Sequence, residues 1–431
     1  MTRHTLKHIT IILFLGFARL ACAQTADTVK LDLAGAEKSF ASKNLLLLAS
    51  KYEVEANKAL EIQARLWENP NFYFEQAIYN NLSGKYFPTK TRYSDGSLGQ
   101  NQLSVTQLIS ISGKINKRTK LARISTELAQ YQFYDLLRTL KYSLKTSFYS
   151  LYYNQRSYQL YNVQIESLSG TINAVKEQSE KGNISTAEYL RLVAFQNNLK
   201  NEQIEILKTI NEQNRELHTL LGDSSVTIYS PVVNAESINN ITPESFNIKQ
   251  LIDSAYANRS DLKVQEALVK YENQNLSYQK ALAVPDINLA GVYDRNGSYI
   301  PNYYGFGVGL PISIFNRNQG NIKASKARIK EAEATSMNYK FQVQNDIIVA
   351  YEAFRQVNKF YSTLDKKLTS QYEQLLSGII TNYSKRNISL VEFLDYYESF
   401  RNNLIQLNAI QAERFNSIES LNYEIGKTLY K

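Results

Sequence analysis

The chain has 431 residues, of which only 7 are proline and 17 are glycine, and its formal net charge is +9. So few prolines and glycines exclude a series of small domains joined by flexible linkers and favour long uninterrupted elements. One cysteine and three histidines exclude a disulfide framework and a cysteine-based metal centre, so we expect neither a metal site nor a cofactor.

The first segment, residues 1–23, has the pattern of an export signal. Basic residues precede an apolar run, and the small residues Ala21-Cys22-Ala23 form a cleavage site before the expected mature start at Gln24. Lipidation of Cys22 is the competing interpretation, but Arg19 stands where a lipobox has an aliphatic residue. Removal of this signal takes away three basic residues and lowers the net charge to +6, and a mildly basic exported protein need not bind nucleic acid.

The rest of the chain divides into two similar halves. The first half covers residues 24–222 and the second covers residues 246–431, and a linker with Pro231 and Pro243 occupies residues 223–245. Each half is expected to contain a helix, a pair of strands and a long helical hairpin, in that order.

The expected strand pairs occupy residues 70–112 and 285–315. From Tyr304 to Ile314, large apolar residues alternate with small ones, which indicates a strand with two different faces. The first half shows the same alternation more weakly, from Leu103 to Ile111. Strands of about ten residues cross a bilayer when they are tilted, whereas no segment after the signal approaches the eighteen apolar residues of a membrane-spanning helix.

The expected helical hairpins begin with residues 114–169 and 321–377, which contain no glycine or proline. Apolar residues recur there at intervals of three and four, and a helix of about 56 residues would be roughly 85 Å long. The second helix of each hairpin is predicted to end at a glycine with left-handed backbone angles, Gly222 in the first half and Gly426 in the second.

The same turn string occurs at both hairpin tips, residues 181–186 and 385–390, as KGNIS and KRNIS placed 204 residues apart. We predict left-handed backbone angles at Gly182 or Asn183 in the first tip, and at Asn387 in the second.

A serine in each tip is followed three residues later by a glutamate. Ser185 and Glu188 in the first tip, and Ser389 and Glu392 in the second, match the capping box that begins a helix.

Four strands cannot enclose a channel, and an open sheet edge cannot face lipid because its amides would lack hydrogen bonds. The apolar stripe from Tyr304 to Ile314 would also be a large exposed patch on a monomer. Cyclic self-association solves both problems, because strands from several copies complete one cylinder.

Residues 310–329, LPISIFNRNQGNIKASKARI, resemble the strand-to-helix junction of TolC-type outer-membrane efflux proteins. Residues 257–267, ANRSDLKVQEA, resemble a helix signature of the second half of that family, with Ser260 where proline is usual. The resemblance covers the whole mature chain. It implies an α+β membrane protein that forms a homotrimer, with a 12-stranded β-barrel in the outer-membrane lipid and a 12-helix α-barrel tunnel in the periplasm.

The resemblance also implies the function and the partners. The trimer would be the passive outer-membrane channel of a tripartite efflux system, fed by an inner-membrane efflux pump and a periplasmic adaptor protein. The adaptor would dock on the turns at the tips, where the residues concerned are Lys181, Gly182, Asn183, Ser185, Lys385, Arg386, Asn387 and Ser389.

The gate implied by the resemblance lies at the same tips. Glu392, Asp395 and Glu188 match acids of the family, and Tyr383 matches its gate tyrosine, while Ile388 stands where some members have an arginine that clamps this tyrosine. Three copies of Glu392 and Asp395 around one axis would repel each other and attract cations. A purely capping role stays the alternative for Glu188 and Glu392.

The main alternative is a periplasmic coiled-coil adaptor or scaffold without a channel of its own. It explains the signal and the hairpins, but it does not explain four apolar strands of bilayer length. An enzyme is not expected, because the sequence contains no Ser-His-Asp set, no cysteine nucleophile and no phosphate-binding loop.

Overall fold

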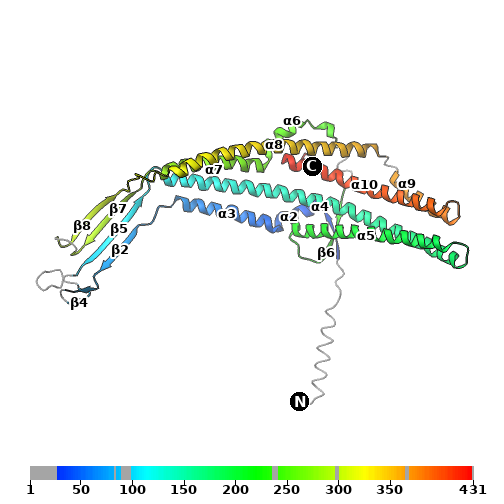
Figure 1. Cartoon of the computed structure of the whole chain (residues 1–431), viewed down its shortest axis with the longest axis horizontal. Coiled ribbons are helices and arrows are strands. Elements are labelled where there is room, and N and C mark those ends of the chain that lie inside the picture. Colours follow the sequence, from blue (N-terminus) through cyan, green and yellow to red (C-terminus); the bar gives the residue numbers. More distant parts are fainter. Residues whose placement is uncertain are drawn as a thin grey trace, which may run out of the picture. The chain divides into compact units, whose positions relative to one another are not determined.

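The computed structural model describes residues 27–81, 84–88, 99–234, 241–296, 300–364 and 368–429 (Figure 1). The expected signal, with Cys22, lies outside the described residues. The chain forms two compact units, one with residues up to 48, 137–257 and 345 onwards, and one with residues 49–136 and 258–344. Each unit therefore takes segments from both halves of the sequence, and long helices run from one unit into the other.

The unit with residues 49–136 and 258–344 contains an antiparallel sheet of four strands in the order β2-β5-β7-β8. The strands are β2 (Asn71–Gln76), β5 (Asn101–Ile109), β7 (Ile287–Asp294) and β8 (Tyr303–Gly309). The two predicted pairs are thus confirmed, and the contact of β5 with β7 joins them. The prediction of a strand up to Ile314 is wrong, because β8 ends at Gly309. Pro311 follows two residues later, and proline has no backbone N–H to donate to a sheet.

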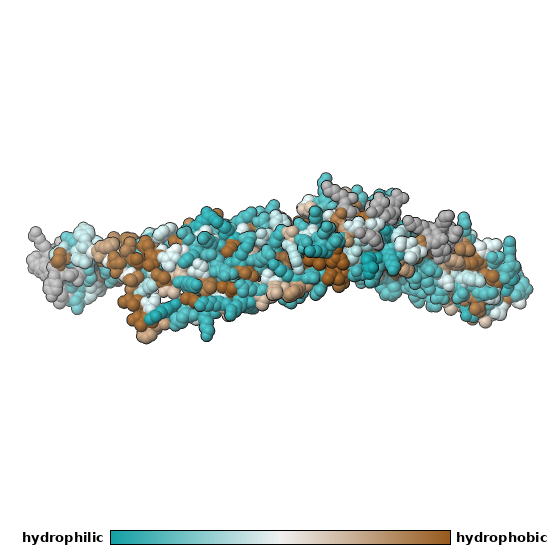
Figure 2. Space-filling view, turned by 90° about the horizontal axis from the view of Figure 1, so that it is seen from above, coloured by the Kyte–Doolittle hydropathy of each residue, from teal (hydrophilic) through white to brown (hydrophobic). Residues whose placement is uncertain are grey.

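The two faces of this sheet differ as the alternation predicted. The register places Phe72, Val105, Gly291 and Phe306 in one row across the four strands. The opposite face carries small and polar residues such as Gly305 and Gly307, whereas Phe306 is 76% exposed on the apolar face. Figure 2 shows the resulting apolar surface in brown near the left end. An apolar patch of this kind marks an interaction surface.

Ion pairs and hydrogen bonds hold the strands to the helices that follow. The Nζ of Lys114 lies 2.7 Å from the Oδ1 of Asp286, and the backbone N–H of Ile111 donates to the same oxygen. One turn further along, the guanidinium of Arg118 donates to the carbonyls of Ala64 and Leu66. Segments of both halves are therefore fixed to each other where the sheet ends. A short hairpin, β3 (Tyr79–Asn80) with β4 (Lys85–Tyr86), extends the loop beyond β2.

The remaining helices of this unit are α3 (Leu45–Arg65), α7 (Ser260–Leu282) and the first parts of α4 (Lys114–Glu180) and α8 (Gln319–Thr363). The expected single helical stretches before each strand pair are in fact two helices each, since α2 (Leu33–Lys43) precedes α3 and α6 (Ile248–Asn258) precedes α7. None of the helices in the described ranges is both long enough and apolar enough to cross a membrane.

The long hairpins are formed by α4 with α5 (Thr186–Leu221), and by α9 (Leu368–Ser384) with α10 (Leu390–Ile425). The prediction for α4 is confirmed, and this helix even continues through Gly170. The prediction of one helix over residues 321–377 is wrong, because α8 ends at Thr363. The hydroxyls of Ser362 and Thr363 donate to carbonyls three residues back, and such local hydrogen bonds compete with the regular helical ones.

The predicted ends of α5 and α10 are confirmed, because Gly222 and Gly426 have left-handed backbone angles. At Gly222 a side chain would also collide with the carbonyl oxygen of Lys43. The Nδ2 of Asn44 donates to the carbonyl of Leu220 beside it, at 2.9 Å. The corner between α2 and α3 is therefore packed directly on the end of α5.

The segment 223–245, which was expected to be a linker, contains a strand. This strand, β6 (Thr227–Val232), pairs in parallel with β1 (Asp27–Asp32). The small sheet is tied to α5 by Asn214, whose side chain accepts from the N–H of Tyr229 and donates to the carbonyl of Thr227. This strand is hard to predict from the sequence, because six residues are too few to show a clear periodicity and its partner is some 200 residues away.

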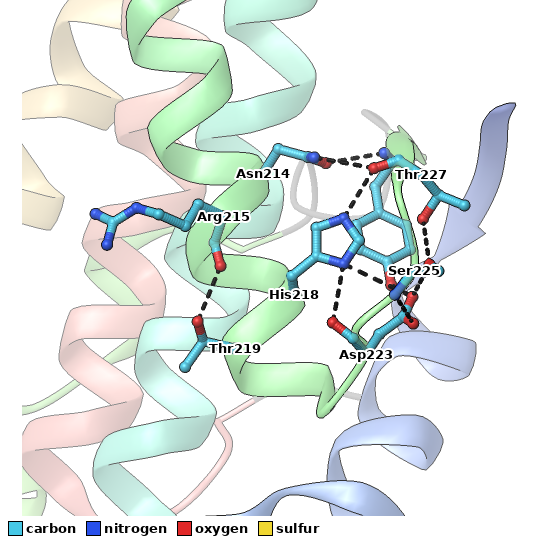
Figure 3. Close-up of polar contacts among 8 residues, drawn as sticks. Asn214, Arg215, His218, Thr219, Asp223, Ser225 and Thr227 are labelled. Carbon is cyan, nitrogen blue, oxygen red and sulfur yellow. Dashed lines mark hydrogen bonds and ion pairs between the residues drawn. The ribbon is translucent and has the colours of Figure 1, made fainter. Parts of the chain in front are cut away.

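The connection from α5 to β6 is closed by a compact polar cluster (Figure 3). The Tyr229 hydroxyl and the backbone and side chain of Ser225 all donate to the Asp223 carboxylate. The ring of His218 bridges Asp223 and Thr227, with Nδ1 3.2 Å from the carbonyl oxygen of Asp223 and Nε2 2.8 Å from that of Thr227. The hydrogen bond from Tyr229, followed by those from Ser225, lowers the pKa of Asp223 to about 2.

This cluster predicts a pH-dependent stability. Because the folded-state pKa of Asp223 lies below its ordinary value of 3.8, its contribution is present above about pH 4 and is lost as the pH falls towards 2. With discounting for its partial exposure, the expected loss is about 1 kcal/mol. The thermal melting temperature of the parent should fall more between pH 6 and pH 2.5 than that of Asp223→Asn. An equal fall in both proteins would contradict the prediction.

Candidate functional site

The sequence-predicted site residues lie at the ends of the two hairpins, which we call the helix tips. The tips share one apolar core to which all four helices contribute, with Val175 from α4, Leu192 from α5, Tyr383 from α9 and Phe393 from α10. The rings of Tyr383 and Phe393 are stacked, with centroids 4.5 Å apart. The tips are therefore packed against each other within one copy of the chain.

Each tip turns through one residue with left-handed backbone angles. In the first tip this residue is Gly182, with a φ of 75°, as one of the two predicted options. In the second tip it is Arg386, with a φ of 64°, so the prediction of Asn387 is wrong. The side chain of Asn387 is instead bonded back to Asn382, at 3.2 Å.

The corresponding asparagine of the first tip, Asn183, behaves in the same way and donates to Gln178 at 2.8 Å. Each asparagine thus joins its turn to the helix before it, while the neighbouring residue takes the unusual backbone angle. Most residues of the turns are exposed, including Lys181, Ser185, Lys385 and Ser389. The turns present backbone groups and basic side chains to any partner.

The two serine-glutamate pairs have different structures. At the second tip the capping box is complete, since Ser389 Oγ accepts from the N–H of Glu392 and the Glu392 carboxylate accepts from the N–H of Ser389 at 2.8 Å. This backbone hydrogen bond lowers the pKa of Glu392. At the first tip Ser185 still accepts from the N–H of Glu188, but the Glu188 carboxylate does not return to the cap. The predicted capping box is therefore confirmed for one tip and wrong for the other.

The Glu188 carboxylate reaches the other hairpin instead. The Tyr383 hydroxyl donates to its Oε1 at 2.6 Å, and an Arg386 nitrogen lies 3.5 Å from the same oxygen. Tyr383 is only 4% exposed, and burial together with the hydrogen bond to Glu188 raises its pKa above the usual range, so it stays a donor. We call Glu188, Tyr383 and Arg386 the tip clasp.

The arginine of the tip clasp was not predicted for this role. Ile388 departs from the family pattern, and the arginine two residues earlier reaches the carboxylate from a left-handed turn. A sequence shows the arginine, but it does not show the backbone angle that aims it. Arg386 was expected only as part of a docking turn.

The other two predicted acids are arranged differently. Glu392 and Asp395 are exposed on α10, three residues apart on the helix, and neither contributes to the tip clasp. A groove of about 520 Å³ lies beside the clasp, lined by the end of α4, by Asn183 and Ile184, and by Tyr383 and Arg386. Among the described residues there is no group of three or more histidines, cysteines, aspartates or glutamates that could hold a metal ion.

Comparisons with known proteins agree with this architecture. A family model described as outer membrane efflux protein matches residues 251–419. The cobalt-zinc-cadmium resistance protein CzcC of Cupriavidus metallidurans is 20% identical over 399 residues, which cover 92% of this chain and 90% of that protein. A similar structure is that of a membrane protein from Pseudomonas aeruginosa, with 16% identity, a TM-score of 0.73 and 91% of each chain covered.

The fold is also shared with the CmeC outer membrane channel of Campylobacter jejuni. That match has 14% identity and a TM-score of 0.71, and it covers 91% of this chain and 85% of the other. The family model thus matches the second half of the chain, while the relative and the two structures extend the likeness over nine tenths of it. The chain therefore contains a region that matches the outer membrane efflux protein family in residues 251–419, and it shares the fold of outer membrane channels over nine tenths of its length.

Proposed function

We propose that the protein works as a homotrimeric passive channel of a tripartite efflux system, closed at the helix tips and opened when a periplasmic adaptor docks there. The observation that carries this proposal is the four-stranded sheet, which has one apolar face and is continuous with the long helices. The adaptor or scaffold alternative is not favoured, because a soluble periplasmic protein would have to hide this face.

The edges of the sheet favour a trimer. In one copy β2 and β8 are the outermost strands, so each has one side without a partner strand. In lipid every unpaired backbone group costs several kcal/mol, and only closure removes the edges. Pairing of β8 of one copy with β2 of the next would close a cylinder of three copies.

The tip clasp supports a gate at the ends of the hairpins. It connects the ends of the two hairpins through a hydrogen bond from a buried tyrosine to a carboxylate, which is one of the stronger kinds of hydrogen bond. The groove beside it, with Arg386 at its edge, offers an adaptor a place from which to compete for Glu188. Docking there would release the hairpins from each other.

The cargo would be determined by the pump that supplies the channel. CzcC is named for resistance to cobalt, zinc and cadmium, so divalent transition-metal ions are the first cargo to test. Exposed Glu392 and Asp395 would favour the passage of cations if three copies faced one axis.

The assembly predicts a specific mass and location. The mature protein should fractionate with the outer membrane and give a trimer of about 140 kDa by light scattering in detergent. A periplasmic monomer or dimer that needs no detergent would contradict the channel.

The tip clasp predicts a leaky channel when it is weakened. Tyr383→Phe and Glu188→Gln should each raise the open probability in planar bilayers about tenfold, because a hydrogen bond to a charged group contributes about 1.5–3 kcal/mol. The matched control is Tyr396→Phe, which changes an exposed tyrosine of α10. If this control opens the channel as much as Tyr383→Phe does, the clasp is not the gate.

Two substitutions separate the effect of the Glu392 charge from its role in the capping box. Glutamine also completes a capping box, so Glu392→Gln removes the charge and keeps the cap, whereas Ser389→Ala removes the cap and keeps the charge. We expect reduced cation selectivity in reversal-potential measurements for Glu392→Gln and Asp395→Asn, but not for Ser389→Ala. A loss of selectivity in Ser389→Ala alone would leave Glu392 as a cap only.

A further inference from the structure

A second glutamate of α5 repeats the chemistry of the tip clasp. The Tyr161 hydroxyl of α4 donates to Glu202 Oε2 at 2.8 Å, and an Arg401 nitrogen of α10 lies 3.4 Å from the same oxygen. As at the tip, one carboxylate oxygen of α5 faces both a tyrosine hydroxyl and an arginine of the second hairpin. We call Glu202, Tyr161 and Arg401 the second clasp.

The burial of Arg401 makes this contact energetically important. Its side chain is only 6% exposed, and a buried guanidinium without a partner is strongly unfavourable. Its other contacts, Asn402 at 3.2 Å and the mostly exposed Glu398 at 3.5 Å, come from its own helix. The ion pair with Glu202 is the one that connects Arg401 to the other hairpin.

The two clasps lie on one side of α5. Glu188 and Glu202 are 14 residues apart, which is close to four helical turns, so their side chains leave the helix in nearly the same direction about 21 Å apart. Between them, the hydroxyl of the fully buried Tyr397 donates to the carbonyl of Gln164 at 2.7 Å. The second hairpin is thus held to the first by the tip clasp, by the hydrogen bond of Tyr397, and by the second clasp about four turns from the tip.

We propose that the second clasp limits how far the tips can separate, and that the channel opens fully only when both clasps are released. This inference rests on the proposed gate at the tips. Release of the tip clasp alone frees Tyr383 and Arg386, but Arg401 still holds α10 against α5. Burial and the hydrogen bond to Glu202 keep Tyr161 a donor, because both raise its pKa. Arg401 and Glu202 are positioning residues and need not contact the cargo.

The test is the single-channel conductance of the full-length trimer in planar bilayers, for Tyr383→Phe, Glu202→Gln and the double variant. Because the tip clasp still closes the single Glu202→Gln variant, we expect that variant to stay closed. The double variant should exceed Tyr383→Phe in the population of its largest conductance state by about tenfold. A double variant indistinguishable from Tyr383→Phe would overturn the second clasp while the gate stands.

The chain offers a matched control on the same helix. Glu205 forms an exposed ion pair with Lys208 three residues away, at 2.7 Å, and such pairs contribute little. Glu205→Gln in the Tyr383→Phe background should leave the conductance states unchanged. An effect as large as that of Glu202→Gln would overturn the assignment, and if Tyr383→Phe itself stays closed, the gate fails and this inference with it.

A cross-link distinguishes the clasp from general stability. Cysteines introduced at Glu202 and Arg401 in the Tyr383→Phe background can be joined by a short bifunctional thiol reagent, with a monofunctional reagent and the parent as controls, since Cys22 is the one native cysteine. Only the bifunctional reagent should abolish the largest conductance state. Full opening of the cross-linked channel would overturn the proposal. So would a Glu202→Gln change that lowers the melting temperature of the Tyr383→Phe protein but leaves its conductance states unchanged.

Discussion

The hydrogen bonds at the two edges of the four-stranded sheet are the constraint on which the rest of the structure depends. Among the described strands of one copy, β2 and β8 each have one row of backbone groups without a partner strand. Because the apolar face of the sheet suits lipid, water cannot supply the hydrogen bonds that these groups need. In the proposed trimer, the strands that close by association are followed by helices that continue the same wall. This explains why α4 begins within a few residues of β5, fixed by the ion pair of Lys114 with Asp286.

The two tips show how one sequence pattern acquires two structures. Both contain Ser-x-x-Glu, yet Glu392 completes its cap and Glu188 leaves its cap for Tyr383 and Arg386. The repeat offset of 204 residues explains the difference, because Ser179 and Gly182 occupy the places of Tyr383 and Arg386 in the first half. Glu392 therefore has no equivalent tyrosine or arginine to bind, and its own backbone N–H groups are the available donors. Glu188 and Glu392 occupy equivalent positions in the two halves, and the donors near each carboxylate determine what it binds.

The sequence predicts those features that depend on neighbours along the chain. Alternation indicated the faces of β8, and the absence of glycine and proline indicated α4. Features that depend on distant residues were missed: the pairing of β1 with β6, the join of β5 with β7, and the hydrogen bond between Glu188 and Tyr383, which are 195 residues apart. The end of α8 and the left-handed angle of Arg386 were missed for another reason, since small local preferences there outweigh a favourable helical composition.

The energies of such clasps fit a gate that a binding partner can open. Each charged hydrogen bond contributes about 1.5–3 kcal/mol, so in the proposed trimer three copies of it would stabilise the closed state by several kcal/mol in total. A partner shifts such an equilibrium only by its difference in affinity for the two states, and about 5.5 kcal/mol converts a mostly closed population into a mostly open one. The proposed adaptor, if it contacts three copies at once, would obtain this difference in affinity from modest contacts with each copy. Beyond the second clasp, α4 and α10 are joined further along by hydrogen bonds such as those of Asn408 with Ser157 and Asn416 with Ser150. The second clasp, four turns from the tip, would therefore be the first ion pair between α5 and α10 to resist an opening that begins at the tips.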